Sequence, residues 1–252
     1  MKVALVQLDT RPNDRESNLR RIEHLTADVE CDLVVLPEMF ATGYNIDAEA
    51  VTEQTNGTTV EWMKSFARER GCAIAGTVAT KERGECFNRF YFCLPDGSLF
   101  HYDKRHLFTF AGEERHFSAG KERVIIEWCG VRILPLVCYD LRFPSWSYLA
   151  GSVDVILYSA SWAASRISAW DILLPARAVE NQAWVVGVNR VGSDHSATPF
   201  CGHSMAYDFM GRKMADCGEK ECIEVVEITR GEIDTFRDKF RAWQDADQIV
   251  IR

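Results

Sequence analysis

The sequence predicts an α/β fold in which two mixed β-sheets pack with their inner faces together and helices cover the outside. Short apolar runs typical of strands alternate with helical stretches in the first half of the chain and again over residues 140–190. Turn residues join other apolar runs directly, which predicts hairpins. The 252 residues contain no repeat, linker or low-complexity stretch, and 47% of them are hydrophobic. We therefore expect one domain over residues 1–252.

Two consecutive β-α units are predicted at the N-terminus. Their strands and helices cover, in chain order, residues 3–8, 15–29, 33–36, 58–70 and 73–79. In the first helix Leu19, Ile22 and Leu25 recur at helical spacing, which places them on one face. The second helix begins with Thr58-Thr-Val-Glu61, which resembles a capping box, and Gly71 marks its expected end.

The rest of the chain predicts hairpins and a further β-α-β unit. The expected elements are strands over 90–94, 99–102, 124–128, 131–137, 153–159 and 184–188 and a helix over 170–180. Turns are expected at Pro95-Asp-Gly97, at Cys129-Gly130 and at Asp208-Phe-Met-Gly211. Proline rarely sits inside a sheet, so Pro135 predicts a bulge or a late start in its strand. Antiparallel hairpins beside β-α units make the sheets mixed.

Composition excludes several classes of protein. The net charge of -8 and the absence of a Lys/Arg run argue against nucleic acid as a partner. The apolar N-terminal stretch is too short for a signal peptide, and no stretch approaches the roughly 18 apolar residues of a membrane span, which predicts a cytoplasmic protein without a membrane partner. The nine cysteines are odd in number and contain no Cys-x-x-Cys pair, so we expect neither a disulfide framework nor a metal site.

Three apolar runs end on residues that carry chemistry. Glu38 ends one run, Lys104 another, and Cys138 follows the run over 131–137. Taken singly, Cys138 is most simply a buried core residue and Lys104 part of a solvated basic loop, whereas an unpaired carboxylate at Glu38 would be costly to bury. Together a base, a cation and a nucleophile are the set that acyl transfer needs.

The segments around these residues closely resemble the nitrilase-like carbon–nitrogen hydrolases. The motifs are Leu-Pro-Glu38-Met-Phe, Asp-Lys104-Arg-His-Leu-Phe and Val-Cys138-Tyr-Asp-Leu-Arg-Phe-Pro. The resemblance spans nearly the whole chain and extends to the segments 176–182 and 186–192. It implies a four-layer α-β-β-α sandwich, association through outer helices into a homodimer or larger homo-oligomer, and no cofactor.

The resemblance also implies a Glu-Lys-Cys triad. Glu38 is then the general base, Cys138 the nucleophile, and Lys104 the group that, with the backbone N–H of Tyr139, stabilises the oxyanion. We expect the neighbouring ammonium and base to increase the thiolate fraction of Cys138. Relatives carry a second glutamate on a loop between the lysine and the cysteine.

Two adjacent glutamates lie in that interval. We favour Glu113, which would hold Lys104 and the substrate amide, over Glu114, for which an ordinary acidic loop face is an equal alternative. His106 and His116 are interpreted as structural.

The short chain and the segment Cys138-Tyr-Asp-Leu-Arg are most similar to omega-amidases, which release ammonia from 2-oxoglutaramate or 2-oxosuccinamate. Such a substrate carries a carboxylate, which is best bound by the paired N–H donors of an arginine guanidinium group. Arg166 is the first candidate to bind this carboxylate, and Arg142 is the alternative. For Arg142 a structural salt bridge is the simpler interpretation. The pocket is expected to be shaped by aromatic residues, namely Phe40, Tyr44 and Trp162.

Other functions stay open at this point. A deaminated glutathione amidase or an N-carbamoyl amino acid hydrolase would use the same catalytic residues on another small-molecule amide. A catalytically silent binding module could share the fold. A thiol-redox protein would form a reversible disulfide at Cys138, although no resolving cysteine is close in sequence.

Overall fold

The computed structural model describes residues 1–149 and 151–247, and its strands form two large sheets. The first sheet consists of β1 (Lys2–Gln7), β2 (Leu33–Val35), β3 (Glu53–Gln54), β4 (Ala73–Glu82), β5 (Glu85–Cys93), β6 (Leu99–Asp103) and β15 (Cys222–Glu227). Its strand order is β15-β1-β2-β4-β5-β6, with β3 beside β4. Strands β1, β2 and β4 are parallel, whereas β15, β5 and β6 pair antiparallel with their neighbours. The sheet is therefore mixed, as predicted.

The second sheet is also mixed. It consists of β7 (Ile126–Trp128), β8 (Val131–Val137), β9 (Val155–Ser159), β10 (Trp184–Val188), β13 (Met205–Tyr207) and β14 (Lys213–Asp216). The order is β14-β13-β10-β9-β8-β7, with β8, β9 and β10 parallel. A separate hairpin is formed by β11 (Val191–Ser193) and β12 (Pro199–Cys201). The predicted turn at residues 208–211 connects β13 to β14.

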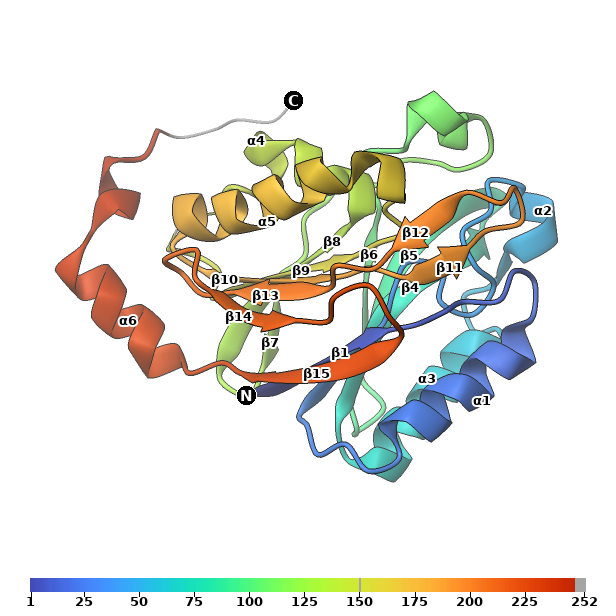
Figure 1. The fold of residues 1–252 in the computed structure, drawn as a ribbon, viewed down its shortest axis with the longest axis horizontal. Helices are drawn as coiled ribbons and strands as arrows, with labels where there is room; N and C mark the ends of the chain where they lie inside the picture. Colours follow the sequence, from blue (N-terminus) through green and yellow to red (C-terminus); the bar gives the residue numbers. More distant parts are fainter. Residues whose placement is uncertain (150, 248–252) are drawn as a thin grey trace.

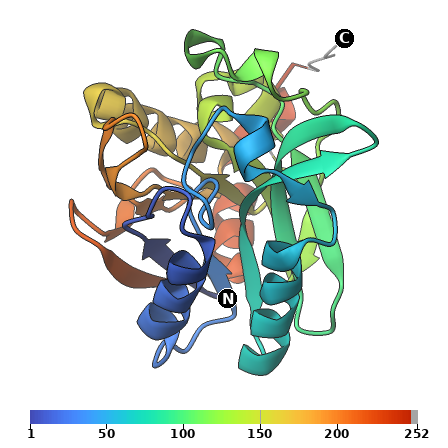
Figure 2. The same cartoon turned by 90° about the vertical axis from the view of Figure 1, so that its right-hand side faces the viewer.

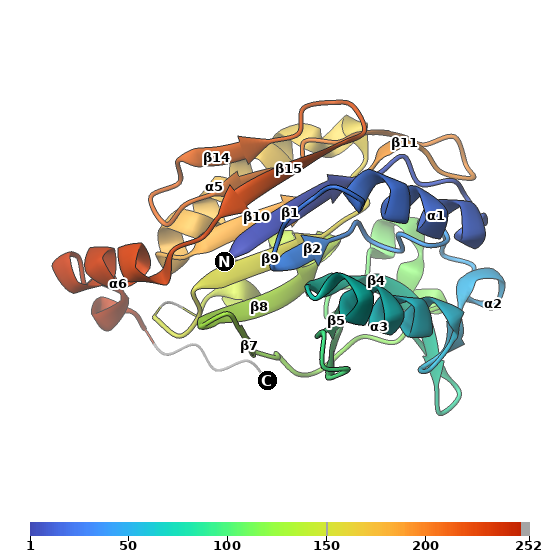
Figure 3. The ribbon, with the colours of Figure 1, turned by 90° about the horizontal axis from the view of Figure 1, so that it is seen from below.

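The two sheets stack, and helices cover their outer faces. In Figure 1, α5 (Ile167–Asn181) lies on one side of the stack and α1 (Arg15–Thr26) and α3 (Thr58–Arg70) lie on the other. Figures 2 and 3 show α1 and α3 side by side on the first sheet. The short helices α2 (Ala48–Val51) and α4 (Pro144–Ser147) and the C-terminal α6 (Arg230–Lys239) complete the α-helices of the described chain. This is the predicted α-β-β-α sandwich.

The alternation of side chains along a strand explains the layering. On β1, Val3 and Leu5 belong to the core between the sheets, whereas Ala4 and Val6 pack in the core beneath α1 and α3. Both faces of the strand are buried, so residues 3–6 of β1 form a continuous apolar run. No helix within residues 1–149 and 151–247 is long and apolar enough to cross a membrane.

The predicted capping box of α3 is wrong. The N-cap residue is Gly57, and Thr58 is already helical. The Glu53 carboxylate on β3 instead accepts hydrogen bonds from the backbone N–H groups of Thr59, at 2.9 Å, and Val60, at 3.2 Å. A full negative charge at a helix N-terminus interacts favourably with the helix dipole. The glutamate reaches this end of the helix because β3 pairs with β4.

The predicted bulge or late start at Pro135 is also wrong, and several predicted ends shift slightly. Strand β8 pairs with β9 in continuous register from Ile133 to Val137, whereas β7 pairs with β8 only as far as Ile133. Pro135 therefore lies beyond the end of β7, where one side of the strand has no ladder partner to lose. Helix α1 ends three residues earlier than predicted, β7 and β9 begin two residues later, and α5 begins three residues earlier.

Candidate active site

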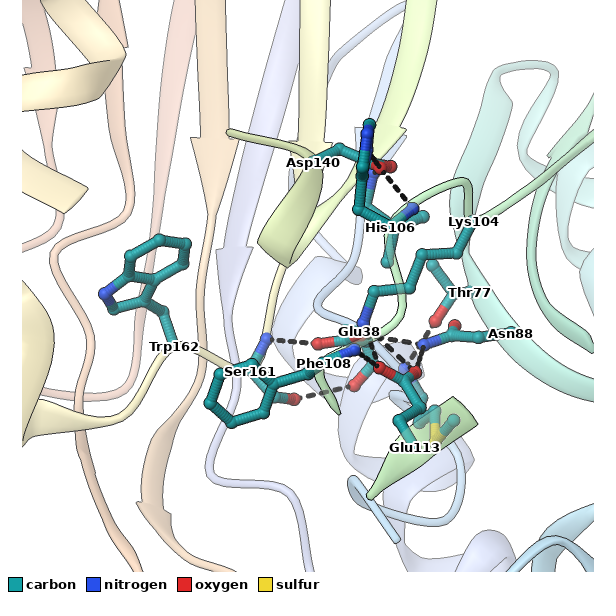
Figure 4. A network of polar contacts seen from close by, with 12 residues as sticks. Glu38, Thr77, Asn88, Lys104, His106, Phe108, Glu113, Asp140, Ser161 and Trp162 are labelled. Atoms are coloured by element: carbon teal, nitrogen blue, oxygen red, sulfur yellow. Dashed lines mark hydrogen bonds and ion pairs between the residues drawn. The ribbon is translucent and has the colours of Figure 1, made fainter. Parts of the chain in front are cut away.

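The three predicted reactive residues meet where the strands of the two sheets end. Glu38 follows β2, and Lys104 comes directly after β6, so both belong to the first sheet. Cys138 comes directly after β8 of the second sheet and begins a 3₁₀ turn over Cys138–Arg142. The stacking of the sheets therefore brings together residues that are up to 100 positions apart in the chain. Figure 4 shows the polar network around Glu38 and Lys104.

Glu38 is fully buried and fully hydrogen-bonded. Its Oε1 accepts from the Lys104 ammonium at 2.8 Å and from the Asn88 side-chain amide at 2.7 Å. Its Oε2 accepts from the backbone N–H of Ser161 at 2.9 Å. A buried carboxylate is tolerated when it has such partners. Asn88 and Ser161 were not predicted, and Asn88 lies before the apolar run over 90–94 that predicted this strand.

A second buried carboxylate, that of Glu113, holds the other side of the ammonium. It lies 2.9 and 3.1 Å from Lys104 Nζ and accepts from the backbone N–H of Phe108 at 2.6 Å. Asn88 Nδ2 donates to both Glu113, at 3.1 Å, and Glu38. Glu114 is at the surface, 3.7 Å from Arg115. Glu113 is thus the member of the pair that lies in the network, as Figure 4 shows.

The two carboxylates keep Lys104 charged. Burial lowers the pKa of Lys104, but attraction to Glu113 and Glu38 outweighs the burial and holds the pKa well above the usual lysine value. The ammonium also lies 5.8 Å from the centre of the Tyr44 ring. Burial and the Glu113 charge raise the pKa of Tyr44, so its phenol stays neutral. The site therefore offers a permanent cation beside the thiol.

Cys138 has an unusual backbone and a neutral thiol. Its φ is +42°, in the left-handed region that residues other than glycine rarely adopt. Burial raises the pKa of the Cys138 thiol well above its usual value, and repulsion from Glu38 adds to this, while Lys104 opposes it. The expectation that the neighbouring charges increase the thiolate fraction is therefore wrong for the resting site. Burial and the carboxylate outweigh the ammonium, so a thiolate forms at neutral pH only if a base removes the proton.

Alkylation of Cys138 by iodoacetamide, followed by mass spectrometry of the peptide that contains it, tests whether the thiol pKa is raised. The rate is expected to keep rising through about pH 9, because the thiol pKa lies above the usual value of about 8.5. A rate that reaches a plateau below about pH 8 in the unsubstituted protein would contradict the raised pKa.

The thiol opens into a cavity of about 340 Å³ that also contains two guanidinium groups. Arg142 lies 4.9 Å from the centre of the Trp162 ring, and Arg166 lies 4.9 Å from that of Phe108. The cavity is lined by reactive, aromatic, cationic and small residues, namely Glu38, Tyr44, Ile46, Lys104, Phe108, Phe110, Ala111, Cys138, Tyr139, Arg142, Ser161, Trp162, Ala163, Arg166, Asp194, His195, Ser196, Thr198 and Phe200. The residues between β11 and β12 form part of this wall and were not predicted.

Of the predicted pocket residues, Phe40 lies elsewhere. Tyr44, Tyr139 and Trp162 line the cavity, but Phe40 is fully buried in the core beneath α1 and α3, 6.1 Å from Trp62. The chain turns at Met39, whose φ is +49°, so Glu38 and Phe40 project to different sides. His106 contacts Asp140 outside the cavity, and His116 is exposed.

Known proteins resemble this chain over nearly its whole length. Residues 2–238 match the family model described as carbon-nitrogen hydrolase. The omega-amidase YafV of Escherichia coli strain K12 is 42% identical over 100% of this chain and 98% of its own length. The 2-oxoglutaramate amidase of Bacillus subtilis strain 168 is 32% identical over 96% of each chain.

The fold of this chain is also similar to that of a solved structure. The CN-hydrolase superfamily protein XC1258 from Xanthomonas campestris, solved with an arsenic adduct in its active site, has a TM-score of 0.96 and 37% sequence identity. The match covers 100% of this chain and 99% of that one. The family match and the two amidase relatives identify an amide-hydrolysing enzyme. The chain belongs to the carbon–nitrogen hydrolase family.

Proposed function

We propose that this amidase hydrolyses the terminal amide of a short 2-oxo dicarboxylic acid monoamide, such as 2-oxoglutaramate or 2-oxosuccinamate, to the acid and ammonia. The observation that carries the proposal is the pair of arginines beside the thiol. Among the described residues, neither Arg142 nor Arg166 has an ion-pair partner. A carboxylate that entered the cavity would find two guanidinium groups, each oriented by an aromatic ring.

The names of the relatives support the same class of substrate. The Escherichia coli relative is an omega-amidase and the Bacillus subtilis relative a 2-oxoglutaramate amidase. A thiol-redox function is less well supported, because Cys138 is the one cysteine among the lining residues and all nine cysteines are free. The predicted homodimer or larger homo-oligomer and the predicted cytoplasmic location stay predictions.

In the proposed first step, Cys138 Sγ attacks the amide carbonyl carbon while Glu38 takes the thiol proton. The carbon–nitrogen bond then breaks, Glu38 returns the proton to the departing nitrogen, and ammonia leaves a thioester on Cys138. A water molecule next attacks the thioester carbonyl, again giving its proton to Glu38. The acid is released, and the proton restores the neutral thiol.

Lys104 stabilises the negative charge that develops on the carbonyl oxygen in both steps. The carboxylates of Glu38 and Glu113 lie on its ammonium, which keeps it charged and fixed in place before the substrate arrives. The backbone N–H of Tyr139, which follows the nucleophile, is the proposed second donor. A single oxyanion donor of this kind typically contributes about 10²–10³ in rate. Glu113 is proposed to act by holding Lys104 and the substrate amide.

Arginine variants assayed on paired substrates test the substrate assignment. Arg166→Met is expected to lower kcat/KM for 2-oxoglutaramate roughly 10- to 100-fold, the loss expected for one charge-assisted hydrogen bond. Hydrolysis of propionamide, which has no carboxylate, should change little in the same variant. Arg142→Met is compared in the same way, and the larger selective loss identifies the arginine that binds the carboxylate.

The unsubstituted enzyme is assayed for ammonia release from 2-oxoglutaramate, 2-oxosuccinamate, deaminated glutathione and an N-carbamoyl amino acid. Preference for the two short 2-oxo amides is expected. Preference for deaminated glutathione or for the carbamoyl compound would keep the amidase chemistry and refute the proposed substrate. Equal losses on propionamide and 2-oxoglutaramate in both arginine variants would refute carboxylate binding by these residues.

A further inference from the structure

A third buried carboxylate, that of Asp140, lies close to the site but does not line the cavity. Its Oδ2 accepts from the backbone N–H of Val137 at 3.0 Å and from the Tyr102 hydroxyl at 2.8 Å. Its Oδ1 accepts from the backbone N–H of His106 at 2.9 Å and lies 2.8 Å from His106 Nδ1. Within the described residues no lysine or arginine forms an ion pair with it. Four contacts thus hold this carboxylate.

These contacts connect the two sheets at the positions that flank the reactive residues. Val137 ends β8 and precedes Cys138, whereas Tyr102 and His106 lie two residues before and two residues after Lys104. Figure 4 draws the contact between Asp140 and His106. One carboxylate therefore connects the backbone that presents the nucleophile with the segment that presents the cation.

The partners of Asp140 are themselves fixed. The Tyr102 hydroxyl accepts hydrogen bonds from Trp146 Nε1 at 2.9 Å and from the backbone N–H of Arg105 at 3.1 Å. The His106 ring stacks on Phe143 with 3.8 Å between ring centres. The network therefore has little freedom to move if one bond is lost.

We propose that Asp140 is a positioning residue that sets the place of the Cys138 thiol relative to the Lys104 ammonium. Cys138 has a left-handed backbone, which persists only where the surroundings hold it. Asp140 supplies such a restraint one residue before Cys138, at the Val137 N–H. The inference rests on the proposed catalytic roles of Cys138 and Lys104, but not on the identity of the amide.

The site requires a carboxylate and not merely a polar side chain. Each oxygen of Asp140 faces one backbone N–H, which can only donate, and one side-chain group, which can rearrange. An asparagine would direct its NH₂ group at one of the two backbone N–H groups in either orientation. Asp140→Asn therefore breaks the link to the Val137 segment or the link to the His106 segment while the size of the side chain stays the same.

The test compares Asp140→Asn with Asp154→Asn, using whichever amide the unsubstituted enzyme hydrolyses. Asp154 is an equally buried carboxylate that precedes β9, does not line the cavity and binds Arg132 and Arg237. Both variants should lose stability. Only Asp140→Asn should lower kcat, by about 10²-fold or more, while KM stays within about threefold, because the lost contact matters in the transition state and not in substrate binding.

The outcomes separate this proposal from the proposed function. If the enzyme hydrolyses another amide and not the 2-oxo amides, the proposed substrate is refuted, but the comparison of the two aspartate variants can still be made. A kcat within about threefold of the unsubstituted value in Asp140→Asn, or an equal loss in Asp154→Asn, overturns the positioning role. If Asp140→Asn does not fold, Tyr102→Phe takes its place, because it removes one of the donors and keeps the ring. An approximately tenfold lower kcat is then expected, and an unchanged kcat overturns the proposal.

Discussion

Replacing Cys138 with serine is expected to lower kcat for amide hydrolysis by at least about 10⁴-fold, the scale on which loss of a nucleophile acts in hydrolases. The resting thiol is neutral, and in the proposed mechanism Glu38 removes its proton. A serine hydroxyl in the same buried place is much harder to deprotonate, and its oxygen is a weaker nucleophile than a thiolate. Ammonia release under saturating substrate measures the effect.

Cys93→Ser is the matched control for this variant. Cys93 is fully buried on β5 and does not line the cavity, so its substitution places the same hydroxyl in a core without touching the site. We expect the control to retain kcat within about threefold while losing some stability, because an unpaired buried hydroxyl is costly. Turnover by Cys138→Ser above one-tenth of the unsubstituted rate would exclude Cys138 as the nucleophile.

Lys104→Met is expected to cause a large loss of stability as well as of activity. The ammonium is the shared partner of two fully buried carboxylates, Glu38 and Glu113. Removing one member of a buried ion pair typically costs about 3–5 kcal/mol, because it leaves uncompensated charge in a site of low polarity. The free energy of unfolding is measured by urea titration, and the folded fraction is assayed for ammonia release.

A lysine at the surface provides the matched control for this prediction. Lys64 pairs with Glu61 at 2.7 Å on the exposed side of α3, and an exposed pair of this kind typically contributes less than about 1 kcal/mol. Lys64→Met should therefore change neither stability nor activity appreciably. Equal stability losses in the two variants would show that the buried network does not depend on the ammonium. Full activity in Lys104→Met would refute the proposed role of Lys104 at the oxyanion.

Local patterns were sufficient for most of the fold. The apolar runs that became β1, β2, β4 and β8 were predictable because burial on both faces leaves a continuous apolar segment. The helix start at Thr58 was predicted for the wrong reason. The N-cap residue is Gly57, and the side chain that accepts from the first turn is that of Glu53, which β3 places beside the helix start. Pro135 is tolerated because the pairing between β7 and β8 ends before it, and the sequence of β8 alone does not show where that pairing ends.

Some features of the site were likewise predictable from local sequence, and others were not. The sequence by itself determined that Glu38, Lys104 and Cys138 stand at strand ends and that a glutamate lies between the last two, because strand ends and residue types are local properties. Only the tertiary structure distinguished the buried Glu113 from the exposed Glu114 and brought the unpredicted Asn88 onto both carboxylates.

The tertiary structure also corrected the charge state expected for the Cys138 thiol and the place expected for Phe40. The thiol pKa depends on burial and on the sum of two opposite charges at distances that the stacked sheets set. Phe40 follows a turn at Met39 that directs it into the core beneath α1 and α3. Such properties arise from groups that are far apart in the chain, and a pattern read along one segment cannot contain the distances between them.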